Sequence, residues 1–123
     1  MRLSKLFRQD RKVNVDDVSD IETLKEIARN HSDYRVRLKA VERIHDEEFL
    51  RCISFEDSNL NVQIACTDNI TSQSHLADIA RNHTNINVKI RAIEKIDDEQ
   101  ILEGILVNES NKRVRDAVLS KSR

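Results

Sequence analysis

The chain has 123 residues, of which 38% are hydrophobic, 35% are charged and 3% are aromatic, with one glycine and no proline. This composition is typical of a helical protein with a mixed-charge surface and disfavours strands. The formal net charge of −1 excludes a general attraction to nucleic acid or to an anionic membrane, so any electrostatic function must come from a local patch.

Cysteine usage and hydropathy indicate the compartment. Cys52 and Cys66 are too few for a disulfide framework, and residues 1–12 lack the apolar core of a secretory signal. No apolar run approaches the roughly 20 residues that a membrane span needs. We therefore expect a cytoplasmic protein without a membrane span.

A repeat organises the whole chain. Segment 24–46 returns as segment 76–98, a more divergent copy covers 50–72, and a shortened copy begins at Leu102. The units are therefore 26 residues long, and equivalent positions in successive units form columns. Because the first and third copies resemble each other most, we infer that a two-repeat block was duplicated.

Residues 1–19 precede the first full repeat. The apolar residues at the start of this segment are helically spaced, which predicts a short cap over the open side of the first repeat. A membrane-surface anchor is the alternative, since Arg2, Lys5 and Arg8 flank the apolar side. Residues 10–19 follow the second half of the repeat, so the segment is read as a cap and a half repeat.

Each full repeat is predicted to contain two short helices. First helices are expected at 21–29, 47–55, 73–81 and 99–107, and second helices at 34–45, 60–71, 86–97 and 112–121. N-cap columns precede both sets: Asp20, Asp46, Ser72 and Asp98 for the first, and Asp33, Asn59, Asn85 and Asn111 for the second. The column Asn30, Glu56, Asn82 and Asn108 is expected to end the first helices in the left-handed conformation.

Apolar stripes on these helices predict how they pack. Leu24, Ile27 and Ala28 recur along the first helices, and Val36, Ala40, Val41 and Ile44 recur along the second. One pair of short helices cannot bury both stripes, so the pairs must stack into a continuous core. We predict one all-α domain over residues 1–123, with repeats at 20–45, 46–71, 72–97 and 98–123. Cys66 replaces an alanine in its column and is expected to be buried, and Cys52 is expected to be more exposed.

The second helices also carry a family resemblance. The stretch 33–41, repeated at 85–93 and 111–118, resembles the D-x-x-V-R-x-x-A-A signature of HEAT-like repeats, including the short type of phycobilin-lyase-like proteins. It departs from the pattern at Gln63, in the asparagines that replace aspartate, and in lacking loop prolines. The resemblance implies a right-handed α-solenoid, usually a binding scaffold and occasionally a bilin-lyase-type enzyme or a nucleic-acid binder.

One basic column falls on the inward side of the second helices: Arg37, Gln63, Lys89 and Arg115. We expect these side chains to run along the interfaces and to pair with Asp33, or with the capping asparagines, four residues back. The column would then stabilise the register of the repeats and take no direct part in binding.

The free face of the second helices is the candidate binding surface. Its apolar row, Leu38, Ile64 and Ile90, is flanked by basic and acidic residues, which suits an extended peptide or an amphipathic helix. The alternative is that this row packs against neighbouring helices. The predicted partner-binding residues are Arg35, Leu38, Lys39, Glu42, Ile64, Asp68, Ile90, Arg91, Glu94 and Lys95.

Other functions receive less support from the sequence. The basic residues of this face run beside an acidic row that would repel phosphates, so nucleic-acid binding is disfavoured. His31 and His83 lie two repeats apart and cannot share one metal within a monomer, and no cofactor site is predicted. We find no glycine-rich loop or nucleophile elbow and expect no catalysis. Assembly into a homodimer through Val107, Val118 and Leu119 of the last repeat is the alternative function.

Overall fold

The computed structural model describes residues 14–121, and this part of the chain is all-helical. A 3-10 helix, η1 (Val15–Asp17), precedes eight α-helices. These form four hairpins: α2 (Ile21–Asn30) with α3 (Tyr34–Glu42), α4 (Glu47–Glu56) with α5 (Leu60–Asp68), α6 (Gln73–Asn82) with α7 (Ile86–Lys95), and α8 (Glu99–Asn108) with α9 (Lys112–Lys121). The predicted all-α fold is confirmed, and the predicted cap in residues 1–13 lies outside the described part.

Both N-cap columns begin their helices as predicted. At α2 the Asp20 side chain accepts a hydrogen bond from the Thr23 N–H, and at α4 Asp46 accepts from the Phe49 N–H. Asn59 caps α5 in the same manner. These side-chain oxygens satisfy backbone donors that have no partner within the helix.

The ends of the first helices differ from the prediction. No residue between 14 and 121 has a positive φ, so the left-handed ending expected at the asparagine column is wrong. Helix α2 ends at Asn30, and the C-cap residue His31 has an extended backbone and donates its N–H to the Ile27 carbonyl. A left-handed residue is unnecessary because the side chain of residue 31 organises the following turn.

Three of the second helices are also shorter than predicted, and α7 ends at Lys95, two residues before its expected end. Helix α3 ends at Glu42 and α5 at Asp68, each three residues before its expected end. After Glu42 the backbone forms a tighter turn, with hydrogen bonds to the third residue back. The N–H groups of Arg43 and Ile44 donate to the carbonyls of Ala40 and Val41. This tighter turn still places Ile44 in the core.

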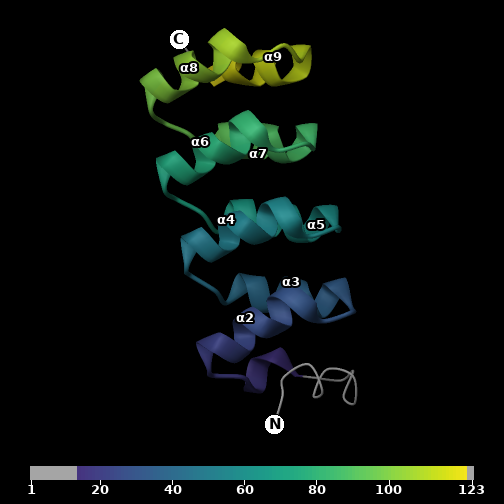
Figure 1. The fold of residues 1–123 in the computed structure, drawn as a ribbon. Coiled ribbons are helices and arrows are strands. Elements are labelled where there is room, and N and C mark those ends of the chain that lie inside the picture. The colour runs from purple at the N-terminus through teal and green to yellow at the C-terminus, as the bar shows by residue number, and fades with distance from the viewer. Residues whose placement is uncertain (1–13, 122–123) are drawn as a thin grey trace.

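The four hairpins stack in chain order, from α2–α3 at one end to α8–α9 at the other (Figure 1). Second helices contact one another from each hairpin to the next, α3 on α5, α5 on α7 and α7 on α9, more extensively than first helices do. The core runs along the whole stack because each interface buries the same columns, which are apolar except at Ser54 and Thr67 in the second repeat. Leu24, Ile27, Ala40 and Val41 are all buried, as the periodicity predicts.

The two cysteines lie in different environments. Cys66 is fully buried on α5, and burial raises the pKa of its thiol to about 12. Cys52 is half-buried on α4. Both placements agree with the sequence-based expectation. Cys66 serves as a small core residue in an alanine column.

Candidate functional site

The turn inside each hairpin is built around one column, here called the turn column: His31, Asp57, His83 and Glu109. Each side chain accepts a hydrogen bond from the backbone N–H two residues on. Nδ1 of His83 accepts from Asn85 at 3.0 Å, and Oδ1 of Asp57 accepts from Asn59 at 2.8 Å. Histidine and carboxylate are interchangeable here because the turn needs only an acceptor.

A second column, here called the strut column, consists of Arg37, Gln63, Lys89 and Arg115. Arg37 Nη1 donates to the His31 carbonyl at 2.8 Å within its own repeat. Its Nε and Nη2 donate to the two carboxylate oxygens of Asp57 in the next repeat, at 2.9 and 3.1 Å. The two side chains are only 12% and 5% exposed, so this bidentate ion pair is nearly buried in the interface.

In the strut and turn columns, the first and last interfaces each carry an ion pair, whereas the middle interface carries two neutral side chains. Lys89 Nζ lies 2.7 Å from Glu109 Oε1 between the third and fourth repeats, as Arg37 pairs with Asp57 between the first and second. Between the second and third repeats, Gln63 stands in the strut column and His83 in the turn column. His83 Nε2 bonds to the Ser54 carbonyl at 2.8 Å, and its ring stacks on Phe55. Since Nδ1 accepts the Asn85 N–H, Nε2 carries the proton and the histidine is neutral.

This geometry confirms a ladder but corrects its partners. We predicted that Arg37 would pair with Asp33, four residues back. Asp33 is instead engaged by Arg35, whose Nη2 lies 3.1 Å from Asp33 Oδ2. Arg37 reaches 20 residues forward to Asp57 because the turn of the next hairpin lies beside it in the stack.

Glu109 makes the fourth repeat sensitive to acid. Burial opposes its ionisation, but hydrogen bonds from Lys89 and the Asn111 N–H, with the charges of Lys89 and Arg115, leave its pKa below the ordinary value. A carboxyl with a lowered folded-state pKa stabilises the protein fully above its unfolded-state pKa, about 4.3, and loses that effect as the pH falls through the folded-state value.

Glu109→Gln is therefore expected to destabilise the protein at pH 7 by about 1–3 kcal/mol, since Lys89 keeps a buried charge without its partner. The difference from the unmodified protein should shrink below about pH 4 and vanish near pH 2. Urea unfolding at pH 7, 5, 3 and 2 measures it, with the exposed Glu103→Gln as the matched control. A difference that persists unchanged at pH 2 would contradict this role for Glu109.

A further column caps the second helices from one repeat to the next. Arg43, Asn69, Lys95 and Lys121 each donate to a backbone carbonyl of the preceding unit, those of Val15, Val41, Asp68 and Glu94. The last three carbonyls lie at or beside the C-terminal ends of α3, α5 and α7, where helix carbonyls lack internal partners. The three cations of this column, Arg43, Lys95 and Lys121, therefore have structural contacts and do not form a free basic stripe.

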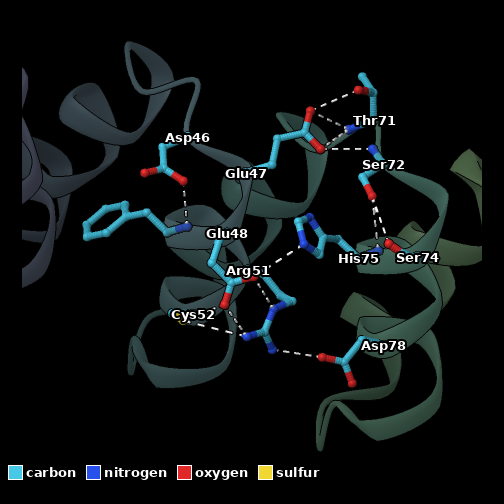
Figure 2. A network of polar contacts seen from close by, with 11 residues as sticks. Asp46, Glu47, Glu48, Arg51, Cys52, Thr71, Ser72, Ser74, His75 and Asp78 are labelled. Carbon is cyan, nitrogen blue, oxygen red and sulfur yellow. Dashed lines mark hydrogen bonds and ion pairs between the residues drawn. The ribbon is translucent and has the colours of Figure 1, made fainter.

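The first helices are joined by a polar network between α4 and α6 (Figure 2). Arg51 bridges the two helices, with Nη2 2.6 Å from Glu48 Oε2 and Nη1 2.8 Å from Asp78 Oδ2. Glu47 accepts from the backbone N–H groups of Thr71 and Ser72 in the linker that leads into α6. The Arg51–Asp78, Glu48–His75 and Glu47–Ser72 contacts join one repeat to the next, so the network is part of the interface.

The predicted binding residues fall into three groups. Asp68, Arg91, Glu94 and Lys95 form a connected set: Arg91 Nη1 lies 2.8 Å from Asp68 Oδ1, and Arg91 Nε lies 3.7 Å from Glu94 Oε1. Arg35, Lys39 and Glu42 are exposed on α3, and of these only Arg35 forms an ion pair among the described residues. Leu38, Ile64 and Ile90 are partly buried against the core, intermediate between the two arrangements considered from the sequence.

The structure also reveals an apolar column that the sequence analysis missed. It lies four residues before the Leu38 row and therefore on the same helix face. Tyr34 and Leu60 are 36% and 37% exposed, and Ile86 is partly buried. Tabulating the first residue of each second helix at the 26-residue period would have found it.

The two rows together form one surface, here called the apolar patch: Tyr34, Leu38, Leu60, Ile64, Ile86 and Ile90. The patch stops at the fourth repeat, where the equivalent residues are Lys112 and Asp116. These form an ion pair of 2.7 Å on the surface of α9. The patch therefore extends across α3, α5 and α7 and has a charged boundary.

Metal and membrane sites were sought in the same part of the chain. Over residues 14–121, no three His, Cys, Asp or Glu side chains come together in a way that would hold a metal ion. None of the helices described has the length and apolar character needed to cross a bilayer. Comparison of the chain with protein-family models, curated proteins and solved structures found no match.

Proposed function

We propose that the chain is a single-domain, right-handed α-solenoid of the HEAT-like type that acts in the cytoplasm as a non-catalytic scaffold for a partner protein. The stacked hairpins and their recurring interfaces support the solenoid. The closer packing of α3, α5, α7 and α9 supports a stack that curves toward the second helices. A surface on that side of the stack would contact a partner through several repeats at once.

The apolar patch is the observation on which the binding function rests. Apolar residues that lie together on the surface of a soluble protein mark interaction sites more often than isolated ones do. Three neighbouring second helices at about 8–10 Å spacing span about 16–20 Å between the outer axes. An amphipathic partner helix of about three turns matches that span.

Charged residues around the patch would orient the partner. Lys39 and Glu42 lie on the exposed surface of α3 and form no ion pair with another described residue. Arg91 and Asp68 already neutralise each other at the opposite end of the surface. A bound helix would therefore place its own charges against α3, and its apolar side chains against α5 and α7.

Peptide display against the full chain tests this proposal. Selected peptides should carry apolar residues at helical spacing, and the double variant Ile86→Lys/Ile90→Asp should weaken their binding at least about tenfold. This variant copies Lys112 and Asp116 of the fourth repeat, so we expect it to fold normally. Leu119→Lys, outside the patch, is the control and should bind normally. Equal binding by both variants would contradict the proposed surface.

Self-assembly is the second candidate function. It is favoured by the exposure of Val107 and Leu119 in the last repeat, 79% and 50% respectively. Sedimentation over a range of concentrations tests it. A dimer that Leu119→Asp disrupts would support assembly, and a monomer at all concentrations would exclude it.

A further inference from the structure

Arg115 on α9 is held in place along one edge of its guanidinium. Its Nη1 donates to the carbonyls of Leu106 and Glu109, at 2.8 and 2.9 Å. Arg37 uses its own Nη1 in the same way on the carbonyl of its turn residue. The other edge of Arg37, Nε and Nη2, grips both carboxylate oxygens of Asp57. In Arg115 that same edge has no hydrogen-bond or ion-pair partner among the described residues.

Two exposed apolar residues lie in columns that face the next repeat. Leu119 is 50% exposed, whereas Val41 and Ile93 in its column are fully buried. Val107 is 79% exposed, and in its column Phe55 stacks on His83, the turn residue of the following repeat. Leu119 therefore occupies a position that is buried in the earlier repeats, and Val107 occupies one that contacts the turn of the following repeat at Phe55.

Glu99 supplies an acceptor on the same face. Its equivalents, Glu47 and Gln73, accept backbone N–H bonds from the linker that leads into the next repeat, at Ser72 and Asp98 among others. Glu99 is exposed, and its side chain makes no hydrogen bond within residues 14–121. We call Glu99, Val107, Arg115 and Leu119 the end face.

We propose that the end face docks a helical hairpin of a partner protein in the position of a following repeat, with a carboxylate in the hairpin turn bound by the free edge of Arg115. Planar, two-point recognition of a carboxylate is what a fixed guanidinium favours. The turn carboxylates of a second copy, Asp57 and Glu109, are already paired with Arg37 and Lys89 of their own chain. A second copy therefore offers no unpaired turn carboxylate among its described residues, and the proposed occupant is a hairpin of different sequence. This surface is separate from the apolar patch.

The proposal can be tested by attaching a hairpin to the end of the chain, where it is held at high local concentration beside the end face. A copy of residues 46–71 placed directly after Arg123 keeps the 26-residue register and presents the equivalent of Asp57 toward Arg115. We expect the added hairpin to fold: helical circular dichroism should increase, and its amides should exchange at least about tenfold more slowly than in an unstructured tail. A copy that stays unstructured would overturn the proposal.

Matched variants test the role of the carboxylate. Arg115→Gln gives the fourth repeat the glutamine that the second repeat has at this position. Gln63 donates a hydrogen bond to the Asp57 carbonyl, which is equivalent to the Glu109 carbonyl bound by Arg115, so the unextended variant should fold normally. In the extended chain, Arg115→Gln, or the change of the appended aspartate to asparagine, should abolish most of the amide protection. Protection that is unchanged in both variants would overturn carboxylate recognition. A stable dimer of the unextended chain, disrupted by Leu119→Asp, would show that the occupant is a second copy and would also overturn the proposal.

Discussion

Arg37→Ala is expected to destabilise the protein by about 3–5 kcal/mol, because it leaves the carboxylate of Asp57 buried without its counter-ion. The Asp57 side chain is 5% exposed and cannot recover hydration without opening the interface between the first two hairpins. Urea unfolding followed by circular dichroism measures the change. Lys112→Ala removes a surface ion pair and should cost less than about 1 kcal/mol, which makes it the comparison.

The neutral residues in the strut and turn columns at the middle interface, Gln63 and His83, supply the control for this prediction. Arg37→Gln combined with Asp57→His places the Gln63 and His83 pair between the first and second repeats. Each single change leaves a charge unpaired, whereas the double change leaves none. We expect the double variant to recover at least about 1 kcal/mol relative to the sum of the single effects. Strict additivity would contradict the interpretation that charge matching decides which residues stand in the two columns.

Val118→Asp is expected to unfold the last hairpin, because it places a charge at a position that is completely buried. This corrects the sequence-based view of Val118 as part of an exposed end. In a stack in which each repeat contacts only its neighbours, the loss should be confined largely to α8 and α9. Hydrogen exchange measured by mass spectrometry should show lost protection there and retained protection in the first two hairpins.

The neighbouring Leu119 provides the comparison. It is 50% exposed, and Leu119→Asp should change the free energy of unfolding by less than about 1 kcal/mol. The two variants introduce the same side chain one residue apart and differ in burial. If both unfolded the last hairpin, the burial assigned to this helix would be incorrect.

Much of the fold follows from the 26-residue period. Helix starts are marked by aspartate, asparagine and serine side chains, which act locally on the next few N–H groups, so the sequence shows them directly. The buried faces follow from helical spacing, as Leu24 and Ile27 illustrate. The left-handed ending was wrong because a side chain two residues before the N-cap of the next helix organises the turn instead.

The contacts between repeats were harder to predict. The pairing of Arg37 with Asp57 depends on the offset between stacked hairpins, which no local pattern encodes. The same offset directs Arg91 to Asp68 and Lys95 to a backbone carbonyl, so charges that look free on one helix are partly engaged by another. Tyr34 and Leu60 were overlooked because they stand at the first position of a helix, outside the stripe used to define the free face.

The alternation of ionic and neutral residues in the strut and turn columns has a consequence for how such a chain can lengthen. Consider a two-repeat block with histidine in its first turn-column position and glutamine in its last strut-column position. At the junction between two such blocks, the strut and turn columns hold neutral side chains. Such a block can therefore be duplicated in tandem without burying an unmatched charge. The first block, with His31 and Gln63, satisfies this condition, and the second begins with His83 but ends with Arg115. Arg115 makes the next junction selective, since a further block beginning with histidine would leave the guanidinium without a counter-ion.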